Sequence, residues 1–294
     1  MRVSKLFAEK NGKPVISFEF FRAKNEKAAA DLEKTLDLLA QTPHDYVSVT
    51  FGAGGSTRDG SFQLIDKLRN ERKLDVVAYI AGIGLGPDDV TAVMDTFQEK
   101  GIETVFAIRG DDPADDAAFA AHPDAMPHAS DLLSFIRSRY DFCLGAAGYP
   151  EGHIEAESLD QDIAYVKLKQ DNGADYIVAQ YFYDNKFYYQ FVERCRAAGV
   201  HVPIVPGIMP IFTVKLMEIL SSVCGSTITG EIREGLAKIP EGEKGGVARF
   251  GVELATRQCA DLLKNGVPGL HFYTMNRGES VNAIVTNLRN QGLL

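Results

Sequence analysis

The sequence predicts a single (β/α)8 barrel, a TIM barrel of the α/β class, with an extra helix before the last strand. Short apolar runs rich in β-branched and aromatic residues recur eight times, with amphipathic helical stretches between them. Strands that are apolar throughout and joined by helices form parallel sheets. Eight such units without a linker-like change in composition favour a barrel over a doubly wound sheet, and one domain over residues 1–294.

The strands are expected where these apolar runs stand. They are VISFEF (15–20), YVSVTF (46–51), VVAYIAG (76–82), TVFAIRGD (104–111), CLGAAGYP (143–150), YIVAQYFYD (176–184), PIVPGIMP (203–210) and GLHFYTMNR (269–277). Leucines recur on one face of residues 27–40, and similar periodicity predicts helices at 88–100, 160–172 and 253–264. Four glycines each follow a helical stretch, as glycines do at helix C-termini: Gly101, Gly173, Gly199 and Gly266. The longest interval, before the eighth strand, is expected to hold the extra helix near 229–238.

Composition and charge exclude several classes of function. A net charge of -9 without a Lys/Arg cluster argues against binding to nucleic acid or to an anionic membrane. No apolar run reaches the roughly 18 residues of a membrane span, and no signal peptide is recognisable, so a cytoplasmic protein is predicted. The four cysteines form no C-x-x-C pair and the six histidines no H-E-x-x-H motif, so no metal site is expected.

Polar residues mark the ends of seven of the eight predicted strands. Because active sites of such barrels form at the C-terminal strand ends, these residues predict a lined pocket. They are Glu19, Thr50, Tyr79, Arg109-Gly110-Asp111, Tyr149, Gln180 and Asn276-Arg277. Glu19 is the least expected of them, since it stands within the aromatic run SFEFF (17–21). An unpaired buried carboxylate costs several kcal/mol, so Glu19 either faces solvent at an edge or has a chemical task.

The motifs give little support to Rossmann-type dinucleotide binding or to a lyase that acts through a Schiff base. The glycine-rich segments at 52–57 and 82–87 each lack the last glycine of G-x-G-x-x-G, so any dinucleotide would bind without a Rossmann fingerprint. A lyase or aldolase acting through a Schiff base needs a desolvated lysine at a strand end. None of the predicted strands contains a lysine, which counts against that alternative.

Taken together, the chain resembles the methylenetetrahydrofolate reductase family over roughly residues 13–290. The resemblance rests on an ordered set of motifs rather than on any one of them. The motifs are SFEFF (17–21), SVTFGAGGS (48–56), RGD (109–111), ASDL (129–132), GYPEGHIEA (148–156), DNGADYIVAQYFYD (171–184), VPGIMP (205–210) and HFYTMNR (271–277). The resemblance implies a flavoenzyme of one-carbon metabolism and methionine biosynthesis that reduces 5,10-methylenetetrahydrofolate with NADH or NADPH.

The same resemblance assigns roles to individual residues. Glu19 matches the general acid that protonates N10 of the folate, and apolar surroundings would help its carboxyl group to retain the proton. Asp111 matches a catalytic aspartate between flavin and pterin, and Gln180 and Arg277 match contacts to folate. The positions that match FAD contacts are Thr50, Phe51, Ala53, Tyr79, Arg109, Gly110, Asp111, His128, Ala129, Tyr149, His153, Ala156, Asp162 and Lys169.

Several positions depart from the family pattern. Tyr79 stands where a histidine usually faces the flavin, and His128 replaces a tyrosine. Other departures, in helices expected to touch the cofactor, folate or nicotinamide, are Tyr165, Leu168, Leu216 and Leu220. They leave an alternative open, a folate-binding subunit with weak or no flavin that relies on another electron donor or runs in the oxidative direction. A homo-oligomer is expected, because apolar helices on the outside of a barrel often pair.

Overall fold

The computed structural model describes residues 1–51, 55–110 and 121–294, and within these ranges the strands form one parallel sheet. Its order is β7-β6-β5-β4-β3-β2-β1-β9-β8. The strands are β1 Val15–Phe20, β2 Tyr46–Val49, β3 Val76–Ala81, β4 Thr104–Ile108, β5 Cys143–Gly148, β6 Tyr176–Ala179, β7 Ile204–Val205, β8 Gly207–Ile208 and β9 Gly269–Tyr273. Every predicted strand begins within one residue of its expected position, so the apolar runs located the strands correctly.

The seventh predicted strand, residues 203–210, is divided into β7 and β8 by Pro206. Proline has no backbone N–H and interrupts the ladder of hydrogen bonds. Strand β7 pairs with β6, whereas β8 pairs with β9 on the other side. The N–H of His271 donates to the carbonyl oxygen of Pro206 at 3.1 Å. The split strand thus brings the two ends of the sheet together into a nearly closed barrel, which confirms the predicted fold class.

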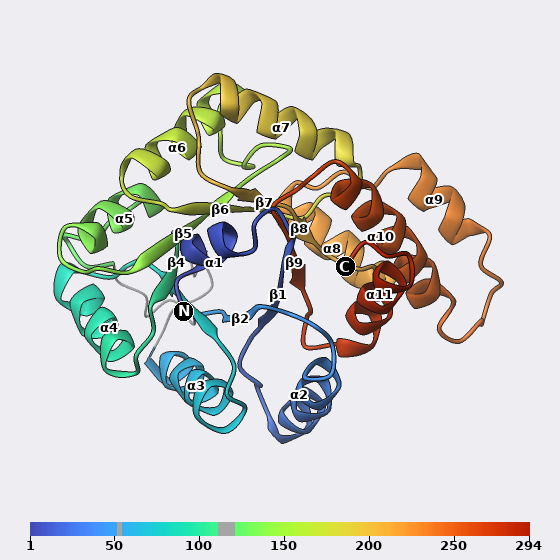
Figure 1. Cartoon of the computed structure of the whole chain (residues 1–294), viewed down its shortest axis with the longest axis horizontal. Helices are drawn as coiled ribbons and strands as arrows, with labels where there is room; N and C mark the ends of the chain where they lie inside the picture. Colours follow the sequence, from blue (N-terminus) through green and yellow to red (C-terminus); the bar gives the residue numbers. More distant parts are fainter. Residues whose placement is uncertain (52–54, 111–120) are drawn as a thin grey trace.

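Helices surround the barrel (Figure 1). They are α1 Val3–Glu9, α2 Glu26–Leu39, α3 Gly55–Asp66 with its π-helical continuation η1 Lys67–Glu71, α4 Pro87–Glu99, α5 Ala129–Arg137, α6 Leu159–Asp171, α7 Asn185–Ala197, α8 Val214–Cys224, α9 Gly230–Ala237, α10 Gly246–Lys264 and α11 Gly278–Asn290. The predicted helices correspond to α2, α4, α6 and the C-terminal part of α10, and the extra helix is α9. Three helices separate β8 from β9, and α8 is the one that the sequence pattern did not predict.

Helix α1, which the sequence pattern did not predict, closes the N-terminal end of the barrel. In Figure 1 it lies at the centre of the ring of helices. Val3 is fully buried and its N–H donates to Oγ1 of Thr104 at 3.2 Å. The ring of Phe7 lies 6.2 Å from that of Tyr176, centre to centre. With this end covered, the opposite end, where the strands have their C-termini, is available for a site.

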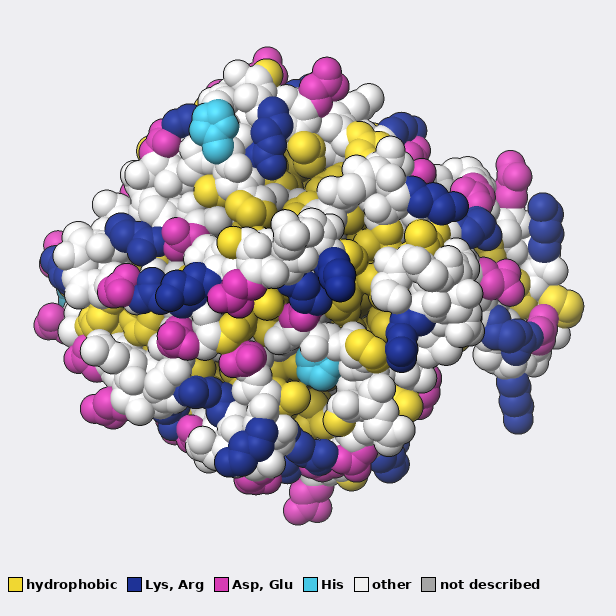
Figure 2. Space-filling model, in the orientation of Figure 1, with side chains coloured by type: hydrophobic (Ala, Val, Ile, Leu, Met, Phe, Trp, Pro, Cys, Tyr) yellow, Lys and Arg dark blue, Asp and Glu magenta, His cyan; other side chains and the backbone are white. Residues whose placement is uncertain are grey.

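The face seen in Figure 2 carries acidic and basic side chains side by side. Ion pairs between acidic and basic side chains occur on the protein, for example Arg2 with Asp141 and Lys10 with Asp45. None of the described helices combines the length and the apolar character that a membrane span requires. The described surface of this face therefore has mixed rather than single-sign charge.

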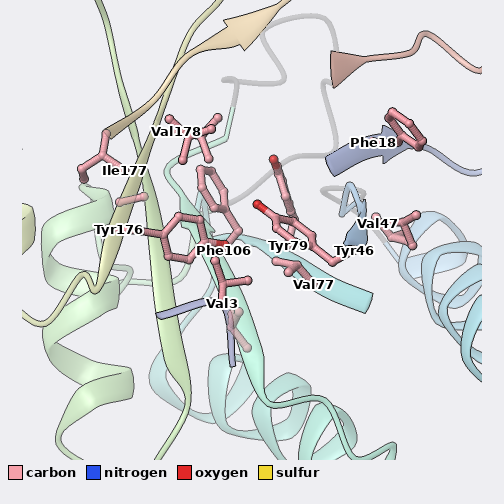
Figure 3. Close-up of a cluster of buried hydrophobic side chains, with 14 of the residues drawn as sticks. Val3, Phe18, Tyr46, Val47, Val77, Tyr79, Phe106, Tyr176, Ile177 and Val178 are labelled. Atoms are coloured by element: carbon pink, nitrogen blue, oxygen red, sulfur yellow. The ribbon is translucent and has the colours of Figure 1, made fainter. Parts of the chain in front are cut away.

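The barrel interior is packed with large side chains (Figure 3). The ring of Tyr79 stacks on Phe106 with centres 4.5 Å apart, and Phe106 in turn contacts Tyr176. Tyr46 is also buried, and its hydroxyl group hydrogen-bonds to Ser17. Inward-facing residues fill barrels of this kind as layers. Polar hydroxyl groups therefore occur within the core, close to the strand that carries Glu19.

Candidate active site

Glu19 lies near the C-terminal end of β1, on the side of the strand that points into the barrel. Side chains alternate along a strand, so Glu19 shares this side with Ser17, while Phe18 and Phe20 point the other way. The aromatic neighbours are fully buried against the surrounding elements, whereas the Glu19 side chain keeps 15% of its surface exposed. The carboxylate is thus neither on an outer edge of the fold nor sealed in the core. It lies inside the barrel, near the C-terminal ends of the strands.

His271, which the sequence analysis did not single out, lies directly beside Glu19. Its Nε2 atom is 3.6 Å from Oε2 of Glu19, and its Nδ1 atom is 2.8 Å from Oγ of Ser17. The His271 side chain is only 1% exposed, and within the described ranges its Nε2 atom makes no hydrogen bond. Ser17 therefore holds one nitrogen of the ring and leaves the other facing the carboxylate.

Two tyrosines also lie within electrostatic range of Glu19. Burial raises the pKa of Tyr79, and the negative charge of Glu19 raises it further. Tyr273 behaves in the same way, with burial as the larger cause of its raised pKa and Glu19 as the next. Both hydroxyl groups accordingly keep their protons. Tyr79, which the sequence analysis assigned only to the cofactor, thus lies close to the candidate acid.

A cavity of about 280 Å³ lies between the ends of β4 and β5 and the helices α5 and α6. Eight of the predicted cofactor contacts line it, although they come from four separate segments of the chain. They are Arg109, His128, Ala129, Tyr149, His153, Ala156, Asp162 and Lys169. The structure therefore brings most of the predicted cofactor residues together around one space.

Two charged side chains of this cavity, Lys169 and Asp162, have few hydrogen-bond partners for their burial. Nζ of Lys169 donates to the carbonyl oxygen of Ala147 at 2.9 Å and lies 5.8 Å from the centre of the Tyr149 ring. Burial lowers the pKa of Lys169, and the charge of Asp162 only partly opposes this. Burial raises the pKa of Asp162, whose buried Oδ2 atom has no hydrogen-bond partner in the described part of the chain. A ligand with both hydroxyl and anionic groups would satisfy these two side chains.

Glu155 is a further cavity residue that the sequence analysis did not identify. Its carboxylate accepts two hydrogen bonds from the guanidinium group of Arg109, one of them at 2.9 Å from Nη2 to Oε1. The Arg109 side chain lowers the pKa of Glu155. The pair joins the end of β4 to the segment between β5 and α6. It orients Arg109 along the wall of the cavity, and the bidentate geometry makes that orientation specific.

The sequence profile for methylenetetrahydrofolate reductase matches residues 3–289. The 5,10-methylenetetrahydrofolate reductase of Escherichia coli is 31% identical over 284 residues, which cover 96% of this chain and 93% of the relative. This chain belongs to the methylenetetrahydrofolate reductase family. Methylenetetrahydrofolate reductase (NADH) 1 of Arabidopsis thaliana is 35% identical over 288 residues. The match covers 94% of this chain but 48% of that relative, so the chain spans about half the length of the plant enzyme.

Solved structures with low sequence identity share the fold of this reductase-family chain. A protein from Clostridium thermocellum, described as binding two copies of 5-methyl-5,6,7,8-tetrahydrofolic acid, aligns with a TM-score of 0.66 at 13% identity. The alignment covers 99% of both chains. A phosphonopyruvate hydrolase aligns with a TM-score of 0.53 at 12% identity, covering 99% of this chain and 88% of its own. At these identities the similarity establishes the fold alone.

The remaining predicted cofactor residues of this family member lie away from the cavity or outside the described residues. The N–H of Thr50 donates to the carbonyl oxygen of Phe20 at 3.0 Å, so Thr50 continues from β2 beside the end of β1. Phe51 is buried, with its ring 5.9 Å from that of Phe62. Gly110 follows β4 with a positive φ of 88°. Ala53 and Asp111 lie outside the described residues.

The two predicted folate contacts are at other strand ends. The N–H of Gln180 donates to the carbonyl oxygen of Gly148 at 2.7 Å, which continues the pairing of β5 and β6. The guanidinium group of Arg277 lies 5.6 Å from the centre of the Phe212 ring. Both residues follow strands that end on the same side of the barrel as Glu19. Their contacts with folate stay predictions for this family member.

The four departures in the helices fall in two places. Tyr165 and Leu168 line the cavity and are 45% and 42% exposed, so they leave an open rim beside Lys169. Leu216 and Leu220 pack against a second apolar cluster that includes Phe212. The first pair therefore changes the cofactor side of the site, and the second pair makes the neighbourhood of Arg277 more apolar.

Proposed function

We propose that this chain catalyses the reduction of 5,10-methylenetetrahydrofolate to 5-methyltetrahydrofolate, acting through bound FAD. The observation that carries the proposal is the placement of Glu19. A partly exposed carboxyl group lies inside the C-terminal end of the barrel, in a chain that belongs to the methylenetetrahydrofolate reductase family. The barrel of residues 1–294 would form one catalytic unit. A homo-oligomer stays a prediction.

Glu19 is the proposed general acid. Its carboxyl group would transfer a proton to N10 of the folate, so that the bond from N10 to the bridging carbon breaks and its electron pair remains on nitrogen. The bridging carbon is then an iminium carbon on N5 and can accept a hydride. General acid catalysis of this kind contributes about 10²–10⁴-fold. His271, held by Ser17 with its Nε2 atom facing Glu19, is placed to stabilise the carboxylate that remains.

Asp162 and Lys169 fit FAD, because this cofactor would supply the hydroxyl and phosphate groups that these two side chains can bind. The unpartnered Oδ2 atom of Asp162 would accept from a ribityl hydroxyl group, and Lys169 would bind the diphosphate. Tyr149 and His153 form the wall between them, with ring centres 4.6 Å apart. Reduced FAD would supply the hydride, and a pyridine nucleotide, NADH in the names of the plant relatives, would regenerate it. Asp111 keeps its proposed catalytic role between flavin and pterin.

Gln180 and Arg277 would orient the folate over Glu19. The amide of Gln180 offers both a donor and an acceptor, which suits the pterin ring. Arg277 carries a fixed positive charge that suits the p-aminobenzoyl carbonyl oxygen or the glutamate carboxylates of the substrate. Contacts at both ends of a long substrate would place N10 near the carboxyl group, and such positioning lowers the barrier to the reaction.

Anaerobic stopped-flow measurements of the flavin absorbance test this function. We expect the purified protein to be yellow, to lose its colour with NADH or NADPH, and to regain it with methylenetetrahydrofolate. A colourless protein that does not bind added FAD would contradict the proposal. It would favour the second candidate, a folate-binding subunit with weak flavin binding, for which the apolar Leu168 beside Lys169 is the supporting observation. A yellow protein that folate reoxidises but neither nucleotide reduces would indicate a different electron donor.

Replacing Lys169 with methionine should weaken FAD binding by about 10–100-fold, the value of a hydrogen bond to a charged group. Because burial lowers the pKa of Lys169, its amine loses the proton at a lower pH than an ordinary lysine. The protonated form binds phosphate, so the affinity of the wild type for FAD should fall as pH rises through this lowered pKa of Lys169. The Lys169→Met variant should lack this dependence. Both effects can be measured by titrating the apoprotein with FAD at several pH values.

Lys167 provides the matched control for this prediction. It lies on the same helix, α6, but forms an ion pair with Asp171 away from the cavity. Lys167→Met should bind FAD as the wild type does, at every pH. Equal affinities of Lys169→Met and the wild type would show that Lys169 does not hold the cofactor.

A further inference from the structure

The turn after β9 has an uncommon backbone conformation next to the proposed acid. Met275 and Asn276 have φ values of 50° and 53°, so two consecutive residues other than glycine occupy the left-handed region. Asparagine is among the residues that tolerate this region, and methionine is not. Such a conformation persists only where surrounding interactions hold it. The interactions that hold it here are made mainly by the side chains of Asn276 and its neighbour Thr274.

The side-chain amide of Asn276 binds both polar groups of one backbone residue. Its Oδ1 atom accepts from the N–H of Phe21 at 3.1 Å, and its Nδ2 atom donates to the carbonyl oxygen of Phe21 at 2.8 Å. The backbone pairing of β1 with β9 ends at Glu19 and Tyr273. The amide therefore continues this pairing beyond the last backbone partner, and it does so two residues after Glu19.

Thr274 fixes the backbone of Glu19 itself. Its hydroxyl group donates to the carbonyl oxygen of Glu19 at 2.5 Å, and its Oγ1 atom accepts from the N–H of Asn276 at 3.1 Å. Thr274 is fully buried. On the other side of the turn, the hydroxyl group of Thr35 in α2 donates to the carbonyl oxygen of Asn276 at 2.9 Å. The backbone from Glu19 to Phe21 is thus tied to the turn at two successive points.

The same turn carries Arg277. Its N–H donates to the carbonyl oxygen of Thr274 at 2.8 Å, and its guanidinium group lies over the ring of Phe212. Glu19 and Arg277 lie 258 positions apart in the sequence. In the fold they are linked by two contacts of the turn, that of Thr274 with the backbone of Glu19 and that of Asn276 with the backbone of Phe21. The turn therefore sets the position of one side chain relative to the other.

We propose that Asn276 is a positioning residue, whose side-chain amide ties the end of β1 to the turn that carries Arg277 and so fixes Glu19 relative to the folate. The inference rests on the proposed function. Asn276 touches neither reacting group. It acts through the backbone of Phe21. Its loss should impair the folate half-reaction, in which the Glu19 carboxyl group must be aligned with N10 of the folate.

Asn276→Gly is the decisive variant, because glycine adopts a positive φ freely and lacks both side-chain hydrogen bonds. We expect hydrogen exchange of the Phe21 amide to accelerate about fivefold to tenfold, the effect of one lost hydrogen bond. At saturating methylenetetrahydrofolate, reoxidation of the flavin should slow by about 100-fold, as small misplacements of reacting groups do. Reduction by NADH should stay within about twofold of the wild type, since Asn276 does not line the cofactor cavity.

Two further variants complete the test. Asn276→Asp keeps an acceptor for the Phe21 N–H, and its protonated carboxyl group can also donate to the Phe21 carbonyl oxygen. At a pH low enough to protonate it, this variant should show less exchange than Asn276→Gly and recover part of the rate. Asn11 is the matched control, an exposed asparagine with a φ of 48° in the turn between α1 and β1, at the opposite end of the barrel. Asn11→Gly should match the wild type in both half-reactions.

The outcomes separate the two proposals. Faster exchange at Phe21 with an unchanged folate step would overturn the positioning role and leave Asn276 purely structural. Unchanged exchange at Phe21 would overturn it as well, because the tie itself would be absent. Failure of the wild type to transfer hydride to methylenetetrahydrofolate would instead overturn the proposed function. A selective loss of the folate step in Asn276→Gly, partly restored in Asn276→Asp, would support the inference.

Discussion

Glu19→Gln is expected to slow flavin reoxidation by methylenetetrahydrofolate by about 10²–10⁴-fold while leaving reduction by NADH intact. Glutamine has nearly the shape of glutamate, so the packing of this side chain in the barrel interior should persist. Its amide cannot transfer a proton to N10 as a carboxylic acid can. Anaerobic stopped-flow measurements of the two half-reactions, each monitored by flavin absorbance, would show the difference directly.

A glutamate far from the site provides the control for this variant. Glu193 is exposed on α7, and Glu193→Gln should match the wild type in both half-reactions. If Glu19→Gln slowed both half-reactions equally, Glu19 would be acting through the flavin or through folding. If it slowed neither, another group would have to supply the proton, and the proposed acid would be wrong.

Gly207→Ala is expected to destabilise the protein by about 3 kcal/mol, near the upper end of the usual cost of overpacking. A Cβ atom at Gly207 would lie 2.2 Å from the carbonyl oxygen of Ala179 and 2.6 Å from Cε2 of Tyr273. The first of these atoms is backbone in β6, and Gly207 begins β8, where the barrel closes. Neither strand can move without loosening that closure. Thermal unfolding should show a midpoint lower by roughly 6–12 °C.

Gly230 allows a direct comparison with the same substitution. It is the first residue of α9, and a Cβ atom there would meet nothing within 4 Å among the described residues. Gly230→Ala should leave the midpoint unchanged or raise it, because alanine favours helices over glycine by up to about 1 kcal/mol. A similar midpoint for both variants would show that the space at Gly207 does not limit the packing.

Local sequence patterns predicted the barrel and much of the site. Continuous apolar runs indicate strands buried on both faces, and the residues just after them must meet at one end of a parallel barrel. That reasoning located Glu19, Arg109 and Tyr149 near their observed positions. The motif resemblance then supplied residues on α5 and α6, such as His128 and Lys169, that line the same cavity. Both signals are local in the chain, which is why they were readable.

The sequence by itself determined the strand positions, the fold class, the family and the identity of the proposed acid. Tertiary structure alone decided which residues surround that acid. Ser17 and His271 are 254 positions apart, and Asn276 binds Phe21 across 255. These pairs meet only because the last strand, β9, closes on the first, β1, and periodicity within a segment carries no information about such contacts. The pairing of β7 with β6 and of β8 with β9 and the closure by α1 follow the same rule, since each depends on which distant backbone lies opposite.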